Sequence, residues 1–61
     1  MNVKNYGFII KGSDYDENKD KVYLNSKSFS STIIAVLSLD DACKAADELV
    51  NIGVDVIELC G

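Results

Sequence analysis

A helix with clear start and stop signals constrains the fold of this chain most. Ser38 is a favourable N-cap, and Asp41 three positions later makes an Asp version of the capping box. Gly53 suits the C′ position that ends a helix, where Val54 can supply the hydrophobic contact of a Schellman motif. We therefore predict one principal helix between Ser38 and Gly53. Its apolar face repeats at helical spacing and consists of Ala42, Ala46, Leu49 and Val50.

Two β-rich segments flank this helix. Residues 32–37 are continuously apolar, which is typical of a strand buried on both faces. Residues 54–60 alternate, so that Val56, Glu58 and Cys60 share one face and residues 55, 57 and 59 the other. Both faces carry apolar residues, which predicts burial on both sides. A strand, a helix and a strand form a βαβ unit with parallel strands and a right-handed crossover.

The remaining residues complete a small α/β domain. Residues 3–11 are rich in aromatic and β-branched side chains and predict a first strand. The polar segment 16–25 can form a short helix with Val22 facing inward, because a long structureless loop is unusual in so small a domain. The predicted fold is thus a single βαβ-based domain over residues 1–61, with a three-stranded, mainly parallel sheet and one principal helix. On the polar, solvent-facing side of that helix, Lys44 can form an ion pair with Glu48.

The size of the chain limits its stability as a monomer. A chain of 61 residues buries about 60% of its unfolded surface. Apolar burial then contributes roughly 85 kcal/mol, and ordering the chain costs about 90 kcal/mol. The two terms cancel, and one helix covers only one face of the sheet. We therefore expect a second copy to cover the other face, in an isologous dimer.

Several absences exclude whole classes of chemistry. The chain has no histidine, so one protomer can hold neither a Ser-His-Asp triad nor a His-ligated zinc. All six basic residues are lysines, and the net charge is −4, which argues against nucleic-acid binding. The longest apolar run, residues 33–37, is too short to span a membrane. Two cysteines form no disulfide framework, and residues 1–6 show no secretory signal, so we expect a cytoplasmic location. No cofactor is indicated.

Candidate site residues lie at the carboxyl ends of the predicted strands, where ligands gather in open α/β sheets. They are Lys11, Glu58, Cys60 and Gly61. Glu58 could act as a general base or bind a ligand; alternatively it is exposed, or a structural partner of Lys11 or of backbone amides. Cys60 could be a nucleophile if its thiol were activated, and otherwise it is a small buried hydrophobe. Cys43 is expected to be a packing residue.

The polar segment contains an acidic repeat that could indicate a metal site. Carboxylate and amide side chains recur at spacing two, as at the start of an EF-hand loop, at Asp14, Asp16, Asn18 and Asp20. The match then fails, because Lys19 occupies the glycine position and Asn25 replaces the bidentate glutamate. We therefore predict a solvated loop and no metal site.

One segment resembles the signature of a known family. Residues 53–61 look like the string Gly-Val-x-x-Ile-Glu-Leu-Cys-Gly of a small prokaryotic family of unknown function, in which Gly-Phe-Gly follows. Residues 6–12 and 38–42 also resemble that family, whereas residues 13–28 match it poorly. The resemblance implies that members continue with another helix and strand, so that this chain looks like an amino-terminal portion. Most of the glycine-rich turn that follows the strand in that family is absent from this sequence. An anion-binding site built on such a turn would therefore lack its main parts.

Two functions are consistent with these sequence features. The marginal core and the uncovered sheet favour a small self-associating or interaction module with no catalytic activity of its own. The placement of Glu58 and Cys60 at a strand end favours a small-ligand-binding or enzymatic domain instead. The expected partners are therefore a second copy of the chain or a small molecule, with no nucleic acid and no membrane.

Overall fold

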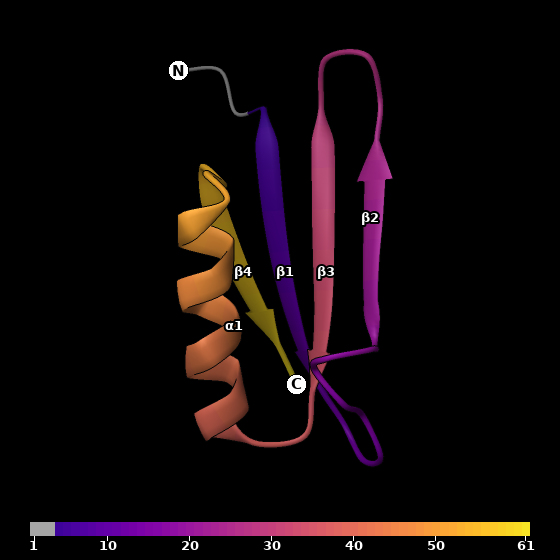
Figure 1. The fold of residues 1–61 in the computed structure, drawn as a ribbon, viewed down its shortest axis with the longest axis vertical. Helices are drawn as coiled ribbons and strands as arrows, with labels where there is room; N and C mark the ends of the chain where they lie inside the picture. The colour runs from indigo at the N-terminus through magenta and orange to yellow at the C-terminus, as the bar shows by residue number, and fades with distance from the viewer. Residues whose placement is uncertain (1–3) are drawn as a thin grey trace.

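The computed structural model describes residues 4–61, in which one helix lies against one face of a four-stranded sheet (Figure 1). The sheet order is β2-β3-β1-β4, so the first strand of the chain lies inside the sheet. In chain order the elements are β1 (Asn5–Lys11), β2 (Lys21–Asn25), β3 (Ser30–Val36), α1 (Leu39–Asn51) and β4 (Val56–Cys60). The predicted α/β class and the mainly parallel sheet are confirmed. Residue 3, where the first strand was predicted to begin, lies outside the described residues.

The three predicted strands are present as β1, β3 and β4, but their predicted number is wrong because the sheet has a fourth strand, and the predicted short helix within residues 16–25 is wrong as well. Lys21–Asn25 forms β2, which pairs antiparallel with β3 and places Val22 opposite Ile33. Every residue of β2 is exposed, so this strand is held mainly by backbone pairing rather than by an apolar face. Val22 and Tyr23 are residues that favour strands, but this five-residue strand lies within a polar segment. Residues 16–20 form a turn, in which the Lys19 and Asp20 amides donate to the Asp16 carbonyl.

The two strands that flank α1 do not pair with each other. β3 and β4 both pair parallel with β1, and the chain crosses over β1 through α1 to connect them. β4 is an edge strand whose residues are half-buried or exposed, so the predicted burial of residues 54–60 on both sides is wrong. β3 lies inside the sheet, as its continuous apolar run indicates, and its Ile34 and Val36 are fully buried.

The helix begins and ends at the predicted residues. Ser38 is the N-cap, and its Oγ accepts the Asp41 amide at 3.2 Å. At the other end Gly53 has φ +89°, in the left-handed region that favours glycine. The Gly53 amide donates to the Val50 carbonyl at 3.1 Å, and the Val54 amide donates to the Leu49 carbonyl at 3.2 Å. These two bonds are those of a Schellman motif.

The helix packs on the sheet through a face that is rotated from the predicted one. Ala42 and Leu49 are buried as predicted, but the third buried position is Ala45, while Val50 is 63% exposed. The buried residues of the helix meet the apolar core of the sheet, which consists of Ile9, Ile34 and Val36. A glycine in β1 allows this close approach, because a Cβ at Gly7 would lie 3.0 Å from Leu49 Cδ1.

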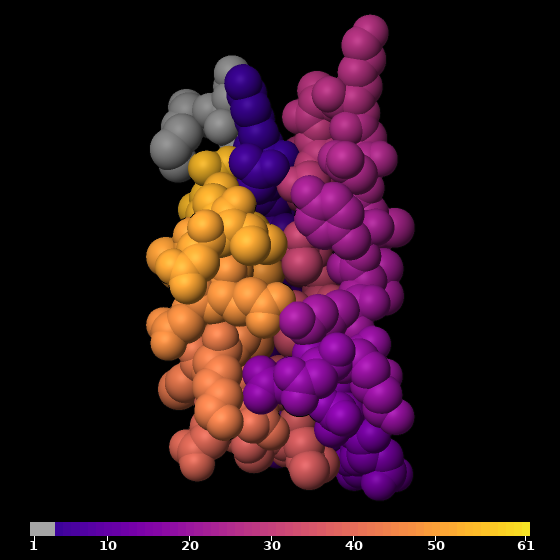
Figure 2. Space-filling model, viewed as in Figure 1, coloured from indigo at the N-terminus to yellow at the C-terminus, as the bar shows by residue number. Residues whose placement is uncertain are grey.

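A salt bridge ties the helix to the strand that the sequence did not predict. Lys21 Nζ of β2 lies 2.7 Å from Glu48 Oε2 of α1. The predicted pairing of Lys44 with Glu48 is therefore wrong, and Lys44 Nζ lies 4.0 Å from Asp41 Oδ1 instead. Figure 2 shows this side of the molecule, with the loop between β1 and β2 in purple beside the first turns of α1.

No helix formed by residues 4–61 covers the opposite face of the sheet. Residues paired in register share a face, and Gly7 and Lys21 both reach α1, which fixes the two faces. We name the other side the open face. Its residues are Tyr6, Phe8 and Ile10 of β1, Val22 and Leu24 of β2, Ser31, Ile33 and Ala35 of β3, and Val56, Glu58 and Cys60 of β4.

Candidate functional site

The structure places Lys11, Cys60 and Gly61 at one end of the sheet but Glu58 midway along it, and the four residues do not share one face. Glu58 lies opposite Phe8 and Cys60 opposite Ile10, both on the open face. Lys11 pairs in register with Val36 and so belongs to the face that α1 covers. Gly61 lies against the Lys11 backbone, because a Cβ there would come within 2.9 Å of the Lys11 carbonyl oxygen. The four residues therefore do not converge on a single point.

Glu58 has a partner that the sequence did not predict. The Tyr6 hydroxyl donates to Glu58 Oε2 at 3.2 Å, so Tyr6 takes the place predicted for Lys11. This hydrogen bond, together with the negative charge of the carboxylate, raises the pKa of Tyr6 above its ordinary value of 10.0. The Tyr6 ring also packs against two aromatic side chains, with ring centroids 5.0 Å from Phe8 and 5.9 Å from Phe29. Tyr6 thus links a polar pair to an aromatic cluster.

The two cysteines are free and exposed. The expectation that they are small packing residues is therefore wrong for both. They lie on opposite sides of the sheet, since Cys60 belongs to the open face and Cys43 to α1. Within residues 4–61, no group of three or more Cys, Asp or Glu side chains could hold a metal ion.

The acidic loop uses its carboxylates to hold its own turn. Asp16 Oδ1 accepts the Asn18 amide at 2.9 Å, and Asp20 Oδ2 accepts the Asp16 amide at 2.7 Å. Burial and a hydrogen bond to Asp41 raise the pKa of the Glu17 carboxyl. The loop therefore lies against the first turn of α1 and is occupied with internal contacts.

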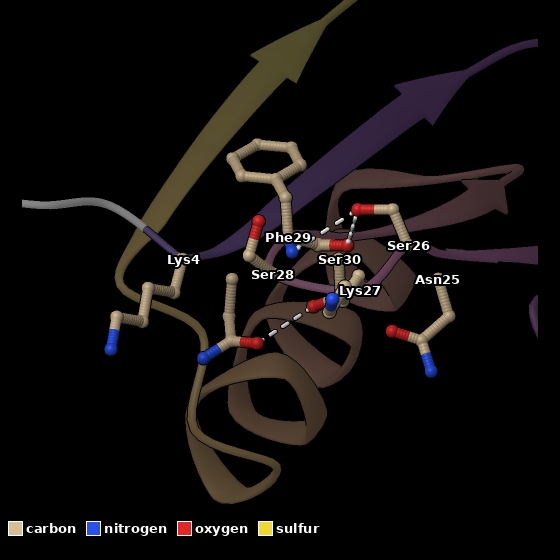
Figure 3. Close-up of a pocket in the computed structure, with 8 residues that line it drawn as sticks. Lys4, Asn25, Ser26, Lys27, Ser28, Phe29 and Ser30 are labelled. Atoms are coloured by element: carbon tan, nitrogen blue, oxygen red, sulfur yellow. Dashed lines mark hydrogen bonds between the residues drawn. The ribbon is translucent and has the colours of Figure 1, made fainter.

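A polar hollow of about 370 Å³ lies at the other end of the sheet, where β1 and β3 begin (Figure 3). Two of its hydroxyls are already used: Ser30 Oγ donates to Asn5 Oδ1 at 2.7 Å, and Ser26 Oγ donates to the Phe29 carbonyl at 2.8 Å. The side chains of Lys4 and Asn25 extend from opposite sides of the hollow in Figure 3. The hydroxyls of Ser26 and Ser30 are therefore engaged within the hollow, and the side chains of Lys4 and Asn25 do not converge on one point in it.

An apolar groove runs between α1 and β4 on the covered side of the sheet. It has a volume of about 370 Å³ and is lined almost entirely by apolar atoms. Leu39 and Leu59 on its two walls are 66% and 64% exposed. The lining residues are Ile9 on the floor, Leu39, Ala42, Cys43 and Ala46 on α1, and Ile57 and Leu59 on β4. The sequence places these positions on a helix and a strand but does not show that the two elements leave a groove between them.

Comparison with known proteins identifies the family. A family of unknown function, DUF6506, matches residues 4–61, which is nearly the whole chain. The chain belongs to the DUF6506 family. This agrees with the resemblance of residues 53–61 to a family of unknown function, while the strand signature and the prokaryotic distribution stay predictions. No curated protein and no solved structure matches this DUF6506 chain. Within the described residues, no helix has the length and apolar character needed to cross a membrane.

Proposed function

We propose that this DUF6506 chain is a cytoplasmic interaction module without catalytic activity, and that it self-associates through the open face. The observation that carries the proposal is a largely apolar sheet face that no helix of residues 4–61 covers. Val22 and Leu24 on that face are 50% and 57% exposed, and the neighbouring Phe29 is 42% exposed. Exposed apolar area of this kind is typical of interaction surfaces.

Two copies can cover this surface mutually. Sheets pack face to face about 10 Å apart, and an isologous pair buries the same patch on both copies. The described chain measures 33 × 18 × 17 Å. A specific interface buries roughly 1,000 Å² in total, so each copy would have to contribute about 500 Å² of its surface. Glu58 Oε2 accepts the Tyr6 hydroxyl at 3.2 Å, but this carboxylate has no cationic partner among residues 4–61. Because an unpaired charge is costly to bury, Glu58 on the edge strand β4 should lie at the solvated rim of such an interface.

Sedimentation equilibrium over a range of concentrations tests this proposal. The chain should rise from 6.6 kDa toward twice that mass as its concentration increases. The double variant Val22→Lys/Leu24→Lys should stay monomeric, since two lysines cannot be buried unpaired on the open face. Leu39→Lys, at a leucine on the helical side that is 66% exposed, is the control and should associate like the parent. A cooperatively folded parent chain that stays at 6.6 kDa up to high micromolar concentration would refute the proposal.

A second candidate function is a small-ligand-binding or enzymatic domain that uses Glu58 and Cys60. It is favoured by one observation, namely that a carboxylate and a thiol share one face of β4 two residues apart. A thermal-shift screen of small metabolites against the parent chain and Glu58→Gln separates the two functions. A ligand that stabilises the parent but not the variant would support this second function. The proposed module should show no such ligand.

A further inference from the structure

The groove between α1 and β4 is separate from the open face, and its chemistry indicates a different partner. Its floor and both walls are apolar, and Leu39 and Leu59 stand exposed at its sides. On α1 the groove is lined at positions 39, 42, 43 and 46, which is the spacing of one helical stripe. Ala42 and Ala46 are small, so a rod such as a second helix can approach α1 closely there.

The rim of the groove on α1 is acidic. Asp40 follows Leu39 and Asp47 follows Ala46, so each lies about 100° further around the helix, beyond the groove wall and away from the buried face. Both side chains are exposed, and neither takes part in an ion pair among residues 4–61. The basic residue of the helix, Lys44, has its Nζ 4.0 Å from Asp41 Oδ1. The groove is therefore apolar at its base and negative along one edge.

We propose that this groove binds an amphipathic helix with a basic flank, supplied by another protein. The apolar stripe of that helix fills the groove between α1 and β4, and its Lys or Arg side chains meet Asp40 and Asp47. Recognition of this kind uses an apolar groove for affinity and rim charges for partner choice. A second copy of this chain is a poor occupant, because its own α1 would bring a second acidic rim against the first. This binding site is separate from the proposed self-association surface, because it lies on the other side of the sheet.

Two synthetic peptides test the proposal with the full chain. Both are short amphipathic helices with the same Leu and Ala stripe; one carries Lys along one flank and the other carries Glu. Fluorescence anisotropy at low ionic strength should show the Lys peptide binding roughly tenfold more tightly than the Glu peptide, a gap that narrows as salt screens the rim. In the variant Asp40→Lys/Asp47→Lys the preference should reverse. Equal binding of both peptides, or an unchanged preference in that variant, would overturn the proposal.

Groove variants and the two cysteines locate the binding site. Leu39→Lys and Leu59→Lys place a charge at exposed groove positions and should each abolish binding, whereas Val22→Lys on the open face should leave it intact. Bound Lys peptide should also protect Cys43, which lines the groove, from alkylation while Cys60 on the other face continues to react. Protection of Cys60 rather than Cys43, or binding that survives both groove variants, would contradict the assignment. Because the open face is not altered by the groove variants, loss of peptide binding and loss of self-association are separate results.

Discussion

The hydroxyl of Tyr6 donates a hydrogen bond to Glu58 Oε2 at 3.2 Å, and this contact joins β1 to β4, at opposite ends of the described chain. It exists because β1 and β4 are neighbours in the sheet, with Tyr6 opposite Val56 and Glu58 opposite Phe8. The two side chains are diagonal neighbours on the open face, a separation that long side chains can span.

The titration of Tyr6 should report this contact. Ionised Tyr6 can no longer donate the bond and is repelled by Glu58, so its pKa lies above 10.0. The contact therefore stabilises the fold at neutral pH, and this contribution is lost as the pH rises from about 10, where the unfolded phenol ionises, through the pKa of folded Tyr6. In Glu58→Gln the pKa should fall toward its ordinary value. Phenolate absorbance in a Tyr15→Phe/Tyr23→Phe background measures it, and an identical pKa with and without Glu58→Gln would contradict this prediction.

Replacing Leu49 with Ala should destabilise the fold by about 2–5 kcal/mol, because its side chain is fully buried between α1 and the sheet. In a domain of this size such a loss approaches the whole stability. Val50→Ala is the matched control; it lies next along the helix but is 63% exposed, and it should change the unfolding free energy little. Chemical denaturation of both variants checks this. Equal losses from the two substitutions would show that the buried face of α1 is wrongly placed.

Asp55 should make stability depend on acid pH. Its Oδ2 accepts the Lys4 and Asn5 amides, each at 3.0 Å, and these bonds hold the pKa of Asp55 below 3.8. The ionised form is favoured by folding, so the stabilisation is present above pH 3.8 and is lost as the pH falls through the lower pKa of folded Asp55. Asp55→Ala should therefore be less stable than the parent at pH 7, with the difference shrinking below pH 3.8.

The control for that experiment is Asp47→Ala, which removes an exposed carboxylate of α1 that has no ion-pair partner among residues 4–61. Denaturant unfolding of the three proteins at several pH values gives the comparison. A loss in Asp55→Ala that is the same at pH 7 and at low pH would mean that the amide bonds do not depend on the charge of Asp55.

At neutral pH, Cys60 should react with iodoacetamide as slowly as an ordinary cysteine whose thiol is not activated. It is exposed, but the chain has no histidine to activate it, and its neighbour in the sheet is Ile10. Peptide mapping by mass spectrometry after timed alkylation distinguishes it from Cys43. Rapid labelling of Cys60 at pH 6 would require an activated thiolate and would favour the enzymatic function over the module.

The features predicted correctly from sequence are those with local causes. Ser38 and Gly53 mark the helix ends through their own hydroxyl and backbone freedom, and both caps form as predicted. The strand β2 was not predicted, although Val22 and Leu24 alternate as in a strand, because it has only five residues within a polar segment and is held mainly by pairing with Ser30–Val36. The buried face of the helix was predicted with Val50 where the structure has Ala45. Residue spacing shows that the helix has an apolar stripe, but it does not show which part of that stripe contacts the sheet.

In the candidate site too, the features with local causes were predicted and those that depend on distant parts of the chain were not. Alternation along residues 54–60 correctly placed Glu58 and Cys60 on one face. It could not show that β1 lies between β3 and β4, and this arrangement is what makes Tyr6 the partner of Glu58 and moves Lys11 to the other side. The apolar groove likewise depends on how α1 and β4 sit side by side, which neither segment specifies alone.

The position of β1 in the sheet sets the order in which this chain can fold. β1 is synthesised before both of its neighbours, since β3 follows β2 and β4 follows the helix. The β2–β3 hairpin can close early, because its strands are joined by a short turn in which Ser26 and Phe29 exchange hydrogen bonds. The parallel pairings of β1 need much longer loops to close and are intrinsically slower. During synthesis the edge of β1 that pairs with β4 therefore has no partner from residues 4–61 until β4 has left the ribosome.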